Sequence, residues 1–199
     1  MYPLKDRPVS YKDGPAYKVK YNRRDFLKCG VMAGLVSMLP APVYAARRLF
    51  QPLAKSLHLY HLQTDKSLDI LYCRQGKYLP EALAKINYFL RDHRTNEVIP
   101  INKRLIDLLY DISKKLRADH PFHIISGYRS PSTNSYLRKC RSGVARNSLH
   151  MLGKAVDITL PDCKLSSLHH VAVEMRAGGV GYYPAHKFIH VDVGRVRYW

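Results

Sequence analysis

Two stretches in the first half of the chain alternate between apolar and polar residues, the two-residue period of a β-strand. They span residues 57–63 and 67–72, and Thr64-Asp65-Lys66 separates them. This arrangement predicts a β-hairpin. His58 and His61 fall on opposite faces of its first strand, where we expect both imidazoles to be solvated.

Three later segments carry apolar residues at intervals of three and four, the spacing of an amphipathic helix. Pro80-Glu81 is a typical helix start, and Asn102 is a plausible N-cap for the next helix. Two more helices are expected over residues 131–140 and 164–177, the second ended by Gly178-Gly179. The expected buried stripe of the helix after Asn102 is Leu105, Leu108, Leu109, Ile112 and Leu116.

Short apolar runs over 122–125, 155–160, 180–183 and 188–193 read as further strands. Strands and helices alternate irregularly, and no internal repeat is visible. We therefore expect an α+β fold, in which helices pack on an antiparallel β-sheet.

The first 45 residues have the three parts of an export signal. Asn22-Arg23-Arg24-Asp25-Phe26-Leu27-Lys28 is charged, residues 29–39 are apolar and uncharged, and Pro40-Ala41-Pro42-Val43-Tyr44-Ala45 offers small residues for cleavage after Ala45. The paired arginines resemble a twin-arginine signal, which would engage the twin-arginine export machinery through residues 22–28. The apolar run is shorter than the ~20 residues of a membrane span, so we expect no permanent span in the mature chain. The mature chain, residues 46–199, would then work in the periplasm or cell envelope.

The chain is strongly basic, with 33 Lys and Arg against 15 Asp and Glu and a formal net charge of +18. Such a balance favours polyanionic partners: nucleic acid, an acidic membrane surface or an anionic cell-wall polymer. No nucleic-acid-binding motif is present, and the export signal argues against a nucleic-acid partner. Cys73, Cys140 and Cys163 would remain after cleavage, and their spacing leaves any disulfide pairing open.

Residues 148–160 contain two of the three candidate metal ligands. His150 and Asp157 lie seven apart with Gly153 between them, and His190 follows on a later strand. Two imidazoles and a carboxylate can form a zinc site with three protein ligands, which leaves the fourth position open for water. A lone histidine in an apolar strand is more often a core residue, so the argument rests on the combination of motifs.

That combination resembles the D-alanyl-D-alanine metallopeptidase superfamily, which includes lysostaphin-type enzymes and the zinc domain of hedgehog proteins. It consists of Ser126-Gly-Tyr-Arg129-Ser-Pro, Ser148-Leu-His150 with Asp157, and His190-Val-Asp192. Within the superfamily the chain is most similar to the murein endopeptidase K type. That likeness is carried by residues 90–94, 179–184 and 190–199, and it covers roughly residues 55–199.

The resemblance implies one Zn²⁺ per chain, held by His150, Asp157 and His190, and cleavage of amide bonds in peptidoglycan stem peptides. A bound zinc ion lowers the pKa of water from 15.7 towards ~7. Arg129 resembles the arginine that stabilises the oxyanion or holds a substrate carboxylate. Ser148 and Tyr128 are expected beside the substrate.

At the positions where superfamily members carry their general base, this chain has other residues. Some members carry a glutamate three residues before the last ligand, where this chain has Lys187, and others a histidine two before it, where this chain has Phe188. Asp192 is the remaining candidate, either as the base or as a partner that orients His190. His186 is an alternative base.

The sequence thus predicts an exported zinc-dependent murein endopeptidase, with residues 46–199 as its metallopeptidase domain. Two alternatives stay open: a D,D-carboxypeptidase that trims stem peptides, and a non-catalytic peptidoglycan-binding domain. Neither the choice between 3-3 and 4-3 cross-links nor the oligomeric state can be read from the sequence.

Overall fold

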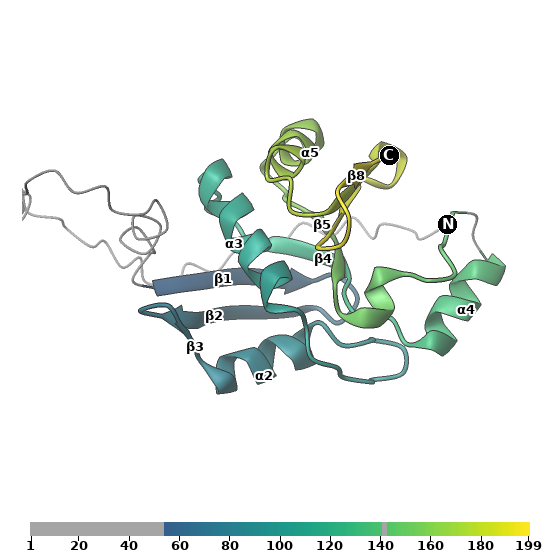
Figure 1. Cartoon of the computed structure of the whole chain (residues 1–199), viewed down its shortest axis with the longest axis horizontal. Coiled ribbons are helices and arrows are strands. Elements are labelled where there is room, and N and C mark those ends of the chain that lie inside the picture. The colour runs from purple at the N-terminus through teal and green to yellow at the C-terminus, as the bar shows by residue number, and fades with distance from the viewer. Residues whose placement is uncertain (1–53, 141–142) are drawn as a thin grey trace, which may run out of the picture. The chain divides into compact units, whose positions relative to one another are not determined.

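The computed structural model describes residues 54–140 and 143–199, and Figure 1 shows how their elements are arranged. The strands of this part are β1 (Ala54–His61), β2 (Lys66–Arg74), β3 (Lys77–Tyr78), β4 (Phe122–Ser126), β5 (Ala155–Thr159), β6 (Gly179–Tyr183), β7 (Phe188–Asp192) and β8 (Arg197–Tyr198). The α-helices are α2 (Pro80–Phe89), α3 (Lys103–Leu116), α4 (Pro131–Cys140) and α5 (Leu165–Glu174), and two 3₁₀ turns are η3 (Leu149–Leu152) and η4 (Pro184–His186).

All of these strands belong to one sheet, ordered β3-β2-β1-β4-β5-β7-β6-β8. The α+β class is confirmed. The four strands β4, β5, β7 and β6 in its centre pair antiparallel, as expected. Two pairings, β1 with β4 and β6 with β8, are parallel, so the sheet as a whole is mixed.

The predicted hairpin is present as β1 and β2, which pair antiparallel. His58 is exposed, but His61 is only 1% exposed, so the expectation that both imidazoles are solvated was wrong for His61. Its ring packs edge-on against Phe89 of α2 and against His93. His61 continues the alternation of the buried residues Leu57 and Leu59, so its burial follows the two-residue period of β1.

The expected helix starts are confirmed. Pro80 occupies the first turn of α2, and the Asn102 side chain accepts a hydrogen bond from the Arg104 backbone N–H at 2.9 Å, which caps α3. The helix expected over 164–177 is shorter at its C-terminal end, since α5 stops at Glu174 and Arg176 adopts a left-handed conformation with φ of 48°.

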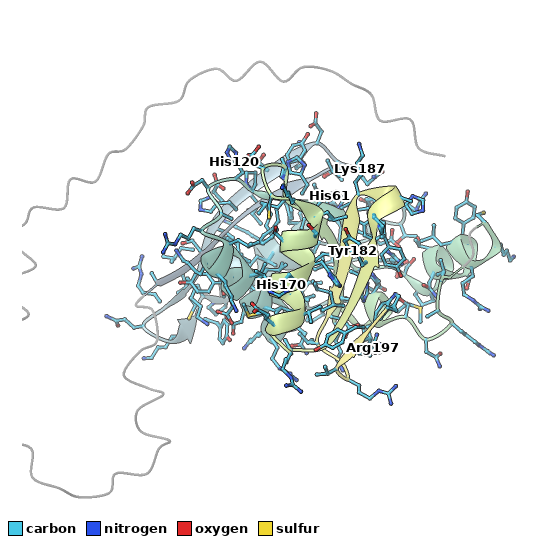
Figure 2. The ribbon with its side chains drawn as sticks, turned by 90° about the horizontal axis from the view of Figure 1, so that it is seen from above. His61, His120, His170, Tyr182, Lys187 and Arg197 are labelled. Carbon is cyan, nitrogen blue, oxygen red and sulfur yellow. The ribbon has the colours of Figure 1, made fainter. Side chains whose placement is uncertain are left out.

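The two faces of the central strands have different tasks. Val156, Ile158, Ile189 and Val191 join the hydrophobic core, which also takes residues from α2, α3 and α5. Asp157 and the residues that alternate with the core positions on β7 therefore point to the opposite face. Tyr182 of β6 faces α5, where its ring lies 4.7 Å from that of His169, and Figure 2 shows it beside this helix.

The export-signal expectations concern residues 1–45 and lie outside the described residues. Within the described part, no helix has the length and apolar content needed to cross a membrane. Cys73, Cys140 and Cys163 are free thiols.

Candidate metal centre

His150 sits on the short turn η3, which is fixed at both ends. The Ser148 side chain accepts a hydrogen bond from the His150 backbone N–H at 3.3 Å. Gly153 ends the turn with φ of 61°, and a Cβ there would lie 2.7 Å from the Pro100 carbonyl oxygen. The Gly153 carbonyl in turn accepts from the Asn102 N–H, so the start of α3 holds the loop that carries His150.

Asp157 and His190 are brought together by strand register. They are direct partners in the antiparallel pair of β5 and β7. Ser126 lies opposite Asp157 on β4, and Gly181 lies opposite His190 on β6. The row Ser126–Asp157–His190–Gly181 therefore crosses the sheet on the face away from the core.

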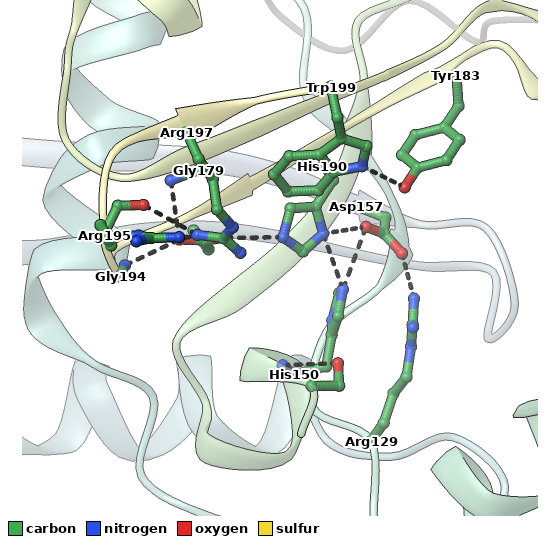
Figure 3. Close-up of polar contacts among 12 residues, drawn as sticks. Arg129, His150, Asp157, Gly179, Tyr183, His190, Gly194, Arg195, Arg197 and Trp199 are labelled. Carbon is green, nitrogen blue, oxygen red and sulfur yellow. Dashed lines mark hydrogen bonds and ion pairs between the residues drawn. The ribbon is translucent and has the colours of Figure 1, made fainter. Parts of the chain in front are cut away.

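Three donor atoms converge where this row meets η3 (Figure 3). His150 Nε2 lies 3.2 Å from Asp157 Oδ1, and His190 Nδ1 lies 2.9 Å from that oxygen. The two imidazole nitrogens are 3.2 Å apart. Ligands of a tetrahedral zinc ion at 2.0–2.1 Å would be separated by about 3.3 Å, so the three atoms are close to the spacing that a metal needs.

The far nitrogen of each imidazole has its own acceptor. His150 Nδ1 lies 2.7 Å from the Gly127 carbonyl oxygen, and His190 Nε2 lies 3.1 Å from Asp192 Oδ2. If each of these nitrogens carries the proton, the lone pairs of His150 Nε2 and His190 Nδ1 are both directed at Asp157. Opposite tautomers of the two rings thus suit one shared cation.

The electrostatics of the three residues agree with this picture. Burial lowers the pKa of His150 and outweighs the pull of Asp157, so the ring is held neutral. Burial opposes the charge of Asp157, yet the Arg129 guanidinium and the hydrogen bond to His190 hold its pKa well below the usual range. Burial also opposes charge on His190, but its hydrogen bonds to Asp157 and Asp192 raise its pKa. A metal binding here must therefore compete with a proton on His190.

Arg129 lies beside the three candidate ligands. Its Nη2 donates to Asp157 Oδ2, and its Nε donates to Ser126 Oγ at 2.7 Å. The loop that carries it is joined to η3 by a bond from the Arg129 backbone N–H to the His150 carbonyl. The guanidinium thus touches the outer oxygen of Asp157, while Oδ1 stays with the imidazoles.

Asp192 lies on the side of His190 that faces away from Asp157. Its carboxylate is fully buried and accepts the backbone N–H groups of Gly179 and Gly194 at 2.9 and 2.8 Å. It also accepts both Nη groups of Arg197, at 3.2 and 2.7 Å. Burial opposes its charge, but the bonds from His190, Arg197 and the two glycines lower its pKa.

The other residues expected at the site differ in how far they are exposed to solvent. Tyr128 is 6% exposed and belongs to the core, which leaves its side chain little surface to offer a substrate. Ser148 is also buried and caps η3. His186 is exposed on η4, and its ring stacks on that of Phe188 with the ring centroids 6.2 Å apart.

The sequence did not single out Gly127, Arg197 or Trp199 as partners of the candidate ligands. The Trp199 indole lies 5.4 Å from the His190 ring, centroid to centroid. A signal was available for this contact: glycines at 179 and 181, inside an apolar strand, often mark the close approach of another group.

Comparison with known proteins places the chain. The family model described as peptidoglycan L,D-endopeptidase MepK matches residues 51–199. The chain belongs to this family. The peptidoglycan L,D-endopeptidase MepK of Escherichia coli K12 is 40% identical over 182 residues, which is 92% of this chain and 99% of that protein. A probable peptidoglycan L,D-endopeptidase MepK of Haemophilus influenzae is 37% identical over 91% of this chain and 97% of that protein.

This MepK-family chain is therefore a peptidoglycan-hydrolysing peptidase, and the family resemblance seen in the sequence is confirmed. The matched region contains every residue of the three-donor cluster. His150, Asp157 and His190 form a possible metal site in the described part of the chain, because one ligand atom from each lies within 4.8 Å of the others.

Proposed function

We propose that the protein is an exported, zinc-dependent murein endopeptidase that hydrolyses amide bonds in the peptide cross-links of peptidoglycan. The observation that carries the proposal is the cluster of His150 Nε2, Asp157 Oδ1 and His190 Nδ1 at mutual separations of 2.9–3.2 Å. Both imidazoles meet an acceptor on their other side, which favours lone pairs directed inward. Family membership supports peptidoglycan as the substrate.

His150, Asp157 and His190 would hold one Zn²⁺, which when bound supplies a Lewis acid and an activated water. Arg129 uses Nε and Nη2 to hold Ser126 and Asp157. A guanidinium carries five N–H donors, so further donors remain for a substrate oxygen. We assign Arg129 to the oxyanion or to a substrate carboxylate, and Ser148 to shaping the loop of His150.

We assign Asp192 to orienting His190. The assignment is supported by its place behind the ring and by four other hydrogen bonds to its two oxygens. A carboxylate so fully occupied, with its pKa lowered, is a poor proton acceptor for water on the opposite side of the imidazole.

The bond that is cleaved is the finer question. The relatives' names specify an L,D-endopeptidase. A 3-3 cross-link joins an L-centre carboxyl to a D-centre amine, whereas a 4-3 cross-link joins two D-centres. We therefore propose 3-3 links as the preferred substrate. Mass spectrometry of digests of purified 3-3 and 4-3 dimers tests this choice. Release of terminal D-alanine from monomers, with both dimers intact, would instead indicate a D,D-carboxypeptidase.

We also propose that residues 22–28 direct twin-arginine export, with cleavage after Ala45 and residues 46–199 as the mature domain. Such a leader would deliver the folded domain to the periplasm. N-terminal sequencing of the protein from envelope fractions, compared with a variant in which Arg23 and Arg24 are both lysine, tests the assignment. Cytoplasmic retention of only the double variant is the expected result.

The metal is tested with His150→Ala and with a matched control, His58→Ala, whose imidazole is 63% exposed on β1. We expect about one zinc per chain in the wild type and the control, and none in His150→Ala. Cleavage of sacculi should vanish on chelation and return when zinc is added. Zinc-independent cleavage by the wild type would overturn the proposed metal centre.

A further inference from the structure

The segment after β7 folds back across the strand next to His190. Its strand β8 pairs parallel with β6. The Trp199 carbonyl accepts from the Tyr182 N–H at 2.9 Å, and the Trp199 N–H donates to the Val180 carbonyl at 3.2 Å. Arg197 and Trp199, two residues apart, thereby project from the same side of this segment toward His190 (Figure 3).

Arg197 grips the carboxylate that holds the His190 ring. Its Nη2 donates to Asp192 Oδ2 at 2.7 Å and its Nη1 donates to Asp192 Oδ1 at 3.2 Å, a two-point contact. Oδ2 is also the atom that meets His190 Nε2. The contact depends on Gly179, because a Cβ there would lie 2.5 Å from both Arg197 Nη1 and Asp192 Oδ2.

The Trp199 indole packs against the His190 ring, with the ring centroids 5.4 Å apart and the planes tilted by 45°. Gly181, opposite His190 on β6, leaves room for the indole, since a Cβ at this position would lie 2.7 Å from it. The indole Nε1–H donates to Tyr183 Oη at 2.7 Å, and the Arg197 guanidinium lies 4.9 Å from the indole centroid. Trp199 is thus held by the hydrogen bond of its indole N–H, by its two backbone hydrogen bonds and by the contact of its ring with Arg197.

We propose that Arg197 and Trp199 are positioning residues that clamp His190 in the orientation needed to bind the metal. Arg197 acts through Asp192, and Trp199 acts by contact with the imidazole. The inference rests on the metal centre proposed above. It assigns no chemistry on the substrate to either residue, so its first consequence is for metal affinity.

The first test measures zinc dissociation constants by chelator competition on the full mature chain. Arg197→Ala should bind zinc about 10-fold more weakly, the lower end of the usual loss for a partner behind a ligand, because Arg197 reaches His190 only through Asp192. Arg197→Lys should recover part of the lost affinity, because lysine keeps the positive charge but cannot donate two parallel hydrogen bonds to the carboxylate. Arg195→Ala is the matched control, since it removes an equal charge two residues away, and only the backbone carbonyl of Arg195 touches Arg197.

The second test uses the fact that Trp199 is the one tryptophan of the 199-residue sequence. All tryptophan fluorescence therefore comes from this indole, which lies 5.4 Å from the His190 ring. Titration with Co²⁺ should quench the wild type and Arg195→Ala saturably at one equivalent. Arg197→Ala should need a correspondingly higher Co²⁺ concentration. Trp199→Phe, followed by chelator competition because it lacks the fluorophore, should bind zinc more weakly than the wild type.

The outcomes separate the two proposals. If the wild type binds no zinc, the metal centre fails and the clamp fails with it. If the wild type binds zinc and both Arg197→Ala and Trp199→Phe match its affinity, the clamp alone is overturned. An equal loss in Arg195→Ala would also overturn it, since the effect would then be one of general charge. Circular dichroism of the metal-free variants must match the wild type for a loss of affinity to support the clamp.

Discussion

A carboxylate beside a metal ligand can accept a proton from water or hold the ligand in place, and the surroundings of Asp192 favour the second role. All of the hydrogen-bond partners of its carboxylate are donors, and the residue is fully buried. In the sequence, the spacing of His190 and Asp192 put both on one face of a strand but left the two roles open. The deciding contacts come from Gly179 and Arg197, which a reading of local spacing does not connect to Asp192.

Asp192→Asn separates the two roles. An amide oxygen can still accept from His190, but it loses the charge that Arg197 holds, so zinc affinity should fall about 10- to 100-fold. Saturating zinc should then restore most of the cleavage rate. The measurements are the zinc dissociation constant and the rate with excess zinc. Normal zinc binding combined with a large loss of rate would instead make Asp192 the proton acceptor.

His61 predicts a loss of stability in mild acid. Burial lowers its pKa to about 4, with a smaller contribution from His93, against about 6.5 for a solvated histidine. Between these values the unfolded chain binds a proton that the folded chain excludes, so stability falls as the pH drops from 6.5 towards 4. We expect His61 to account for roughly 2 kcal/mol of this loss.

Urea unfolding of the wild type and His61→Gln at several pH values between 7 and 4.5 measures this contribution. The free energy of unfolding of the variant should depend less steeply on pH. His58→Gln, which removes an exposed imidazole from the same strand, should retain the wild-type slope. Equal slopes for all three proteins would show that His61 carries no such linkage.

At the scale of elements, the sequence predicted more about helices and strands than about their arrangement. Pro80 and Asn102 mark helix starts because capping is a local interaction. The parallel pairing of β1 with β4, and of β6 with β8, joins segments far apart in the chain, and no local pattern encodes it. The motifs singled out His150, Asp157 and His190, which the fold brings together, whereas the burial of Tyr128 depends on packing that motifs do not describe.

Asp107 joins α3 to the first three strands. Its carboxylate accepts from Lys55 Nζ and Tyr72 Oη at 2.9 Å each, and from Tyr78 Oη at 2.5 Å. Tyr72 is fully buried, so removing its acceptor leaves a hydroxyl without a partner in the core. The network lies on α3 and the first three strands, which contain none of the candidate metal ligands. We therefore expect it to stabilise the fold without affecting the metal centre.

Asp107→Ala should therefore lower the free energy of unfolding by about 3 kcal/mol. Zinc affinity measured under native conditions should be unchanged. Asp111→Ala, an exposed carboxylate one turn further along α3, is the matched control and should change stability by less than about 1 kcal/mol. Similar effects for both variants would contradict a specific role for the Asp107 network.

The whole chain has a formal net charge of +18, and residues 46–199, the proposed mature domain, keep about +13 of it. An anionic envelope polymer would attract it over a distance of about 10 Å at moderate salt. We expect binding of a catalytically inactive His150→Ala protein to purified sacculi to weaken steadily as salt rises. Sedimentation with sacculi at increasing NaCl concentration measures this. Binding that does not depend on salt would show that charge does not hold the enzyme on the wall.

The row Ser126–Asp157–His190–Gly181 makes the donor cluster a test of correct strand pairing. Slipping β5 or β7 by one residue would turn Asp157 or His190 to the opposite face and bring Val156, Ile158, Ile189 or Val191 into its place. A chain in the wrong register could not bind the ion with all three donors. Metal binding would therefore stabilise only the correctly paired sheet, so that loading the cofactor also selects properly folded molecules.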